Sequence, residues 1–247
     1  DLVARAERHV IEHADILGMA NSSLYAGGPP AASLHDAVRR LGLRRCQGLI
    51  LSTCTAGFMR SLPFDQVQKR EALWRHSYLT AMICRHLNED LHLGFAGEEF
   101  TAGLMHDIGR SLLAATIPEE YFHSCSDALN GSPESLERER ELLGTDHCEL
   151  GATFARRSGL PAQLVAVIQH HHYPEYSGEH HKLVAMVAVA DEMATKLELC
   201  RNDLTDSSPA TFLYSTLGDG ERVQHTLSGL SSDFAERSAA EAQRLIA

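Results

Sequence analysis

The chain has 247 residues, of which 44% are hydrophobic, so it is long enough to bury a substantial core in one or two domains. Acidic residues outnumber basic ones by 33 to 22, and the formal net charge is −11. A surface of this charge repels phosphate backbones, which argues against direct nucleic-acid binding. A small anionic ligand is not excluded, because a bound dication would reverse the local field.

The six cysteines form no C-x-x-C pair and no compact framework. This usage predicts reduced, mostly buried thiols in a cytoplasmic protein. No signal-peptide pattern opens the sequence, and the apolar run from Leu183 to Ala190 is far shorter than the roughly 20 residues that a membrane helix needs. We therefore expect no membrane association.

Sequence patterns typical of strands are scarce, and residues typical of helix starts and ends are frequent, which predicts an all-α fold. Apolar positions recur at helical spacing over residues 73–87 and 160–168, and Leu183–Ala194 is apolar nearly all round, which predicts a central helix. Ser132 before Pro133 and Asp146 before Glu149 are typical of helix starts, the second with the spacing of a capping box. Glycine- and proline-containing breaks between helices fall near residues 27–30, 61–63, 131–133, 173–178 and 206–209.

Seven residues with metal-ligating side chains follow one another along the chain in the order His, His-Asp, His, His-His, Asp. Imidazole and carboxylate suit borderline and hard divalent cations, and seven such ligands are enough for two ions. The adjacent pair His106-Asp107 lies in an otherwise apolar stretch, where both side chains would be costly to bury without a partner such as a metal. The seven are His76, His106, Asp107, His147, His171, His172 and Asp191.

This order resembles the H…HD…D pattern of the HD superfamily of metal-dependent phosphohydrolases. A narrower resemblance, to the HDOD (HD-related output domain) family, covers roughly residues 10 to 200. That family is bacterial, all-helical and usually attached to signalling modules. The segments that look like its signatures are residues 17–25, 37–42, 146–152 and 168–174.

The resemblance implies an all-α, HD-domain-like helical bundle with an N-terminal helical lobe. We expect an HDOD domain at residues 1–204, divided into the lobe at 1–64 and an HD-like lobe at 65–204, with a C-terminal helical extension at 205–247. The chain begins at Asp1 and enters an HDOD-like motif almost at once. We therefore expect it to be the C-terminal part of a longer, response-regulator-like protein with an upstream receiver or sensor domain.

The resemblance also implies a division of the ligands between two divalent ions, which could be Fe, Mn, Ni, Zn or Mg. Two ions about 3.5 to 4 Å apart could clamp a phosphoryl oxygen during hydrolysis. Asp107 and Arg110 would then be the catalytic residues, with Arg110 reaching a phosphate; the alternative for Arg110 is a surface arginine. One ion would be bound by His76, His106, Asp107 and Asp191, and the second by His147, His171 and His172, with Asp107 bridging.

Alternatives stay open at several positions. His170 could replace a neighbour as ligand, because helix register is uncertain by a residue or more. His76 could be a hydrogen-bonded core histidine, and Asp191 a buried acceptor for His106. Ala72 stands where some trinuclear relatives carry glutamate, and no GYP motif follows His172, so the resemblance does not support cyclic di-GMP hydrolysis.

The leading hypothesis is a regulatory signalling module that alters its contacts with a signalling protein partner or with itself, for example as a homodimer. The competing hypothesis is a metal-dependent phosphohydrolase that acts on a nucleotide or cyclic nucleotide through the dinuclear site. A third is a sensor whose metal or ligand occupancy is the signal.

Overall fold

The computed structural model describes residues 21, 32–62, 67–116, 133–173, 175–198 and 213–246. All regular secondary structure within these ranges is helical, which confirms the predicted all-α fold. None of the helices in the described part of the chain is long and apolar enough to span a membrane. The HDOD-like signature at 17–25, apart from Asn21, and the predicted breaks at 27–30 and 206–209 lie outside these ranges.

The helices are α2 (Leu34–Leu41), α3 (Leu43–Ser61), α4 (Val67–Leu91), α5 (Glu98–Met105), α6 (Ile108–Thr116), α8 (Pro133–Leu143), α9 (His147–Arg157), α10 (Ala162–His170), α11 (His181–Glu198), α12 (Tyr214–Leu217), α13 (Gly220–Ser228) and α14 (Ser232–Ile246).

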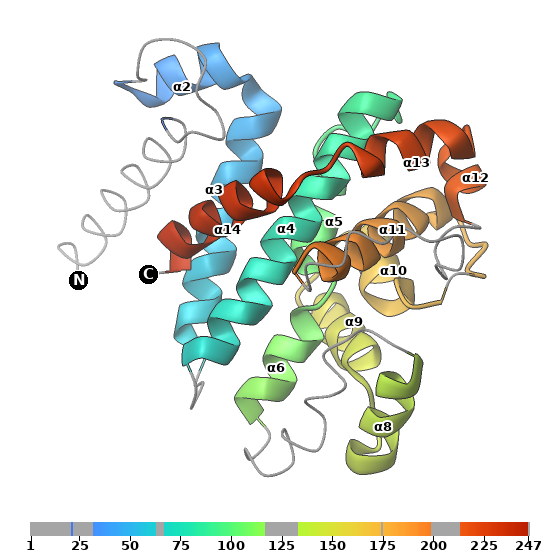
Figure 1. Ribbon diagram of the computed structural model, residues 1–247. Helices are drawn as coiled ribbons and strands as arrows, with labels where there is room; N and C mark the ends of the chain where they lie inside the picture. The colour runs from blue at the N-terminus through green and yellow to red at the C-terminus, as the bar shows by residue number, and fades with distance from the viewer. Residues whose placement is uncertain are drawn as a thin grey trace, which may run out of the picture.

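Helix α4 runs through the middle of the molecule and packs against α5, α11 and α14 (Figure 1). Helix α11 buries ten residues between Leu183 and Ala194, so the predicted central helix is confirmed. Its neighbours in the main hydrophobic core come from α4, α10, α12 and α13. Helices α4 and α11 therefore form the frame on which the shorter helices are placed.

A second core joins the two ends of the described chain. The indole Nε1 of Trp74, on α4, donates a 2.7 Å hydrogen bond to the carbonyl of Ala242, on α14. Leu245 and Ile246 on α14 pack in the same cluster as Met59 on α3. The C-terminal helix α14 thus shares a core with α3 and α4.

Local signals account for several helix boundaries. The Asp146 carboxylate accepts a 2.8 Å hydrogen bond from the backbone N–H of Glu149, so Asp146 caps α9 as its spacing predicts. The reciprocal half of a capping box is not formed, since the Glu149 carboxylate instead contacts Arg156 and Gln169. Helix α8 begins at Pro133, one residue after the predicted Ser132 cap.

Helices α6 and α9 approach so closely that only glycine fits between them. A Cβ on Gly109 would lie 1.8 Å from the carbonyl oxygen of His147. A Cβ on Gly151 would lie 2.8 Å from the Ile168 side chain and 3.1 Å from the backbone nitrogen of Gly109. This contact brings the first residue of α9 beside the turn that precedes α6.

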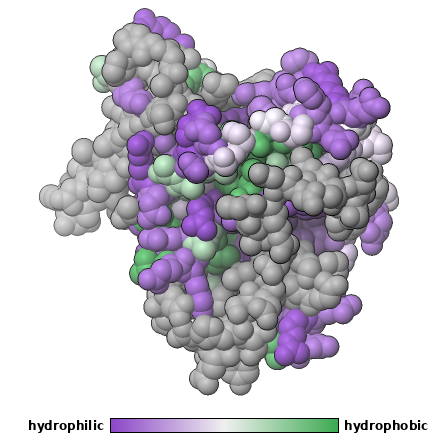
Figure 2. All heavy atoms as spheres, in the orientation of Figure 1, coloured by the Kyte–Doolittle hydropathy of each residue, from purple (hydrophilic) through white to green (hydrophobic). Residues whose placement is uncertain are grey.

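The described surface is mainly polar. Figure 2 shows one face, on which hydrophilic side chains predominate and hydrophobic ones are exposed in small groups. Among large hydrophobic residues, Leu43 and Ile50 on α3 and Val67 on α4 are exposed. Scattered exposure of this kind is ordinary for a folded protein and identifies no functional surface.

The α6–α9 contact generates a stability prediction. Gly109→Ala should lower the free energy of unfolding by about 1–3 kcal/mol or more, because the new methyl group meets backbone that cannot rotate away. Gly57→Ala is the matched control, since a Cβ there would meet only the end of Arg60 at 3.9 Å, and it should be neutral or stabilising by up to about 1 kcal/mol. Urea unfolding of the two variants and the wild type checks this, and equal midpoints would contradict it.

Candidate metal centre

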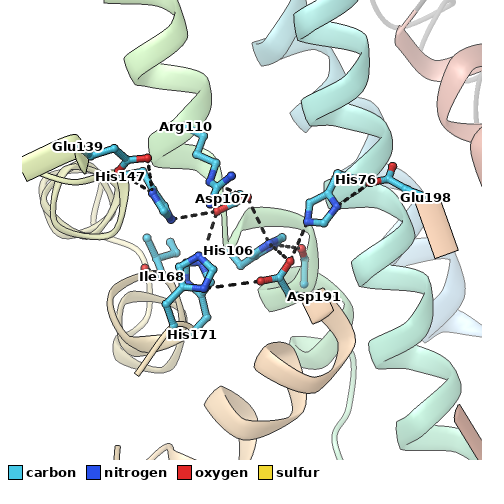
Figure 3. A network of polar contacts seen from close by, with 12 residues as sticks. His76, His106, Asp107, Arg110, Glu139, His147, Ile168, His171, Asp191 and Glu198 are labelled. Atoms are coloured by element: carbon cyan, nitrogen blue, oxygen red, sulfur yellow. Dashed lines mark hydrogen bonds and ion pairs between the residues drawn. The ribbon is translucent and has the colours of Figure 1, made fainter. Parts of the chain in front are cut away.

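Six of the seven predicted ligands are labelled in Figure 3 and converge on one largely buried place, and the seventh, His172, lies beside His147 and His171 in the same place. His76 comes from α4 and Asp191 from α11, while His106 and Asp107 form the turn between α5 and α6. His147 is the first residue of α9, and the pair after α10 completes the set. Five segments that are distant in sequence therefore deliver their polar side chains to the same point in an apolar core.

Asp107 lies at the centre of the arrangement. Its Oδ1 is 3.4 Å from the Nε2 atoms of both His147 and His171. Its Oδ2 is 3.2 Å from Nε of Arg110 and 3.6 Å from Nε2 of His106. This position, facing ligands from both predicted groups, is the one that a bridging carboxylate requires.

Asp191 contacts the histidines on the other side of the site. Its Oδ1 lies 2.8 Å from Nε2 of His76 and 3.7 Å from Nε2 of His106. Its Oδ2 lies 3.9 Å from Nδ1 of His172. Nε2 of His106 therefore faces both carboxylates, Asp107 and Asp191.

Three imidazoles are oriented by hydrogen bonds from Nδ1. His106 donates to the Gly103 carbonyl at 2.7 Å, and His171 donates to the Val167 carbonyl at 3.1 Å. His147 donates to the Glu139 carboxylate at 2.8 Å, and the same carboxylate accepts the backbone N–H of His147 at 2.7 Å. With the proton of a neutral ring held on Nδ1, the Nε2 lone pair is left facing the site, as in metal-binding histidines.

Several of the inward-facing atoms lack hydrogen-bond partners, although Nε2 of His76 is hydrogen-bonded to Asp191. The Nε2 atoms of His106, His147, His171 and His172 are buried and unpaired, and so is Oδ1 of Asp107. Burying so many unpaired polar atoms costs free energy at each one, and groups of this kind in proteins pair or coordinate a metal. The donor set therefore fits a divalent cation.

The donor atoms fall into three overlapping groups, in each of which all atoms lie within 4.8 Å of one another. The first two groups resemble the two predicted ion positions, and the third contains the bridging carboxylate. The metal-binding role of the seven residues stays a prediction. The groups are His76, His106 and Asp191; His147, Cys148, His171 and His172; and His106, Asp107 and His171.

The electrostatics favour the metal-binding forms of Asp107, His147 and His172. Burial opposes the charge of Asp107, but the Arg110 guanidinium and the neighbouring histidines hold the pKa of that carboxyl well below its usual range. Burial and Arg110 lower the pKa of His147 well below its ordinary value, so its ring is neutral. Burial likewise keeps the pKa of His172 well below the usual value. The ionised Asp107 carboxylate thus faces the neutral ring of His147.

The structure decides two of the alternatives. A surface position for Arg110 is wrong, because its guanidinium is buried, at 4% exposure, against Asp107. His170 belongs to none of the three donor groups and its ring stacks on Tyr176 with centroids 4.4 Å apart. The alternative for His76 describes a real contact, since its Nε2 is hydrogen-bonded to Asp191 at 2.8 Å, whereas Nε2 of His106 lies 3.7 Å from Asp191 Oδ1.

Three residues at the site could not be found by the motif comparison. Glu139 holds His147, and Glu198 contacts Nδ1 of His76 at 3.0 Å. Cys148 brings its thiol beside the histidines of one donor group. Glu139 lies in the charged run ERERE, which reads as a solvated helix face, and Glu198 is 122 residues from its partner.

Glu139 should influence metal affinity through His147. Glu139→Gln leaves one acceptor oxygen for two donors, so His147 is held less firmly, and we expect metal affinity to fall about 10- to 100-fold. Calorimetric titration of chelator-treated protein with Zn²⁺ or Mn²⁺ measures this. The matched control is Glu141→Gln on the exposed side of α8, where the wild-type carboxylate contacts only Arg138 among the described residues. Equal affinities in both variants would show that Glu139 does not support the site.

In metal-free protein, His76 should make stability depend on pH. Burial disfavours its charge, but hydrogen bonds to Asp191 and Glu198 outweigh this and raise the pKa of His76 to about 10. The folded pKa lies above the unfolded value of roughly 6.5, so the stabilisation is complete below about pH 6.5 and is lost as the pH rises through 10. Urea unfolding of chelator-treated wild type and His76→Gln should show a gap that narrows between these pH values. A gap that stays constant would contradict the ion pairs.

Comparison with known proteins places these features in a family. The HDOD domain profile matches residues 13–174. An uncharacterized protein of Treponema pallidum is 26% identical over 195 residues, covering 77% of this chain and 37% of that protein. Ribonuclease Y of Deinococcus radiodurans is 32% identical over 133 residues, covering 54% of this chain and 18% of the enzyme. The chain therefore spans well under half the length of these two relatives.

Solved structures share the fold. A candidate phosphohydrolase from Shewanella amazonensis aligns with a TM-score of 0.74 at 23% identity, over 99% of this chain and 86% of that one. An HDOD domain protein of unknown function from Geobacter sulfurreducens aligns with a TM-score of 0.69 at 24% identity, over 95% of this chain and 82% of that one. A candidate signal transduction protein from Marinobacter aquaeolei aligns with a TM-score of 0.71 at 24% identity, over 100% of this chain and 54% of that one. On the match of its sequence over most of its length, the chain belongs to the HDOD domain family.

Proposed function

We propose that this chain is a bacterial, cytoplasmic signalling output domain of HDOD type that holds one or two divalent ions among its seven ligands. The observation that carries the proposal is the set of unpaired, inward-facing Nε2 atoms, which are sealed in the core. Ligands of this kind support a metal centre. Because the ligands are buried, a metal centre that stabilises the fold is better supported than a catalytic centre.

The sealing of the site distinguishes the two main hypotheses. The side chains of His106, His147 and His171 are inaccessible to solvent, and those of Asp107 and Arg110 are about 5% exposed. A phosphoester could approach Asp107 only after the surrounding helices move. A regulatory role needs no such opening.

The ligands come from five separate segments of the domain, so a signal that moves one of these segments would move a ligand. They lie on α4 and α11, at the α5–α6 turn, and at one end each of α9 and α10. A cation that binds all of these ligands stabilises the conformation in which they converge, because it binds that conformation more tightly than any other. A partner that moves one helix would conversely weaken metal binding, because the coupling is reciprocal.

The partners of such a domain would be an upstream receiver or sensor domain and a further signalling protein, with a homodimer as an alternative assembly. This chain covers only 37% of its Treponema relative and 54% of the Marinobacter chain, which supports an HDOD region working within a longer protein. The negative net charge of the chain disfavours nucleic acid as the partner.

A second candidate function is metal-dependent hydrolysis of a nucleotide or cyclic nucleotide, and Arg110 favours it. Its Nη2 is buried without a hydrogen-bond partner, while its Nε lies 3.2 Å from Oδ2 of Asp107. The unpaired Nη2 could donate a hydrogen bond to a phosphoryl oxygen. A divalent ion, when bound, would supply Lewis acidity to the phosphoester. Asp107 and Arg110 would then be the catalytic pair.

The test begins with elemental analysis of protein purified without chelator and without a polyhistidine tag. We expect one or two transition-metal ions per chain in the wild type and in the control Asp233→Ala, whose exposed carboxylate lies on α14, and a loss of metal in Asp107→Ala. Absence of metal, even after anaerobic loading with iron or manganese, would overturn the metal centre.

The same samples separate regulation from catalysis. We expect no turnover of a broad panel of phosphoesters by the metal-loaded wild type. Metal-dependent turnover that disappears in Asp107→Ala and falls in Arg110→Lys would replace the regulatory proposal with the hydrolase.

A further inference from the structure

One side of the centre contains a sulfur atom. The Cys148 Sγ and one ring nitrogen each of His147, His171 and His172 all lie within 4.8 Å of one another. Cys148 is a free cysteine with 2% of its surface exposed. The other two donor groups contain only nitrogen and oxygen. The site is therefore chemically asymmetric.

The three imidazoles around Cys148 each have an unpaired, buried Nε2. Nδ1 of His147 is used by Glu139, and Nδ1 of His171 faces backbone carbonyls, so both rings have only Nε2 left for an ion. Asp107 Oδ1 lies 3.4 Å from Nε2 of His147 and of His171, but the donor group whose atoms all lie within 4.8 Å of one another contains the Cys148 sulfur and not Asp107, so Cys148 is the fourth donor of this group. Three nitrogen donors with one thiolate are a donor set of tetrahedral zinc.

Local structure holds Cys148 in place. It follows His147 in the first turn of α9, which Asp146 caps, and the glycine contact between α6 and α9 fixes that turn against the Asp107 segment. Cys148 also lines a cavity of about 370 Å³ whose wall includes Arg140, Gln169 and Tyr173.

We propose that Cys148 is the fourth ligand of an ion held by His147, His171 and His172, and that its thiolate makes this position select Zn²⁺, Co²⁺ or Fe²⁺ over Mn²⁺ and Mg²⁺. Coordination forms the sulfur–metal bond and releases the thiol proton to solvent. The position formed by His76, His106 and Asp191 has no sulfur and retains the preference of imidazole and carboxylate. The inference rests on the metal centre of the proposed function and adds a ligand that the family pattern does not include.

Cobalt tests the sulfur directly. Chelator-treated wild type, Cys148→Ser and Cys54→Ser are titrated with Co²⁺, and absorption is followed in the near ultraviolet, where thiolate-to-cobalt charge transfer appears. Cys54 is exposed on α3 and controls for adventitious thiol binding. We expect the charge-transfer band in the wild type and Cys54→Ser and its loss in Cys148→Ser, which should still bind Co²⁺ through its histidines.

The outcomes separate this inference from the metal centre itself. Co²⁺ binding without the band in the wild type, or a band that survives in Cys148→Ser, would overturn ligation by Cys148 and leave the centre standing. No Co²⁺ binding in the wild type would overturn both. Zinc X-ray absorption of the wild type needs no variant, and a first shell without sulfur at about 2.3 Å would also overturn ligation by Cys148.

Discussion

The charge of Asp107 lies almost completely out of water, and the helices around it are arranged so that it is compensated. A buried carboxylate is tolerated only where cations, hydrogen-bond donors or a metal surround it. Here Arg110 contacts one oxygen and the Nε2 atoms of His147 and His171 face the other. Arg110 compensates part of this charge, whereas the Nε2 lone pairs of the two histidines would compensate it only through a bound cation.

Close helix packing and imidazole orientation depend on each other at this site. The contact between Gly109 and the His147 carbonyl places the start of α9 beside the α5–α6 turn. Once the backbone is there, Glu139 fixes the ring of His147, just as the Gly103 carbonyl fixes that of His106. The direction of each lone pair is thus set by a partner behind the ring, which is how proteins prearrange metal ligands.

A sealed centre of this kind favours regulation, because it couples helices without requiring access for a substrate. The side chains of Asp107 and Arg110 are only about 5% exposed. The sulfur of Cys148 adds a further distinction, since it gives one side of the site a softer donor than the other. The identity of the bound metal would then be part of what the domain reports.

The sequence by itself determined the helical class, the central apolar helix α11, the cap at Asp146 and the ordered set of seven ligand types. Each depends on local periodicity or on residue identity, which survive without a structure. Tertiary structure decided which carboxylates support the rings, because Glu198 meets His76 across 122 residues and no spacing rule reaches that far. It also decided that Glu139 and Arg110 are buried, although charged residues are normally solvated, because the ion pairs that compensate for burial form only when the helices pack.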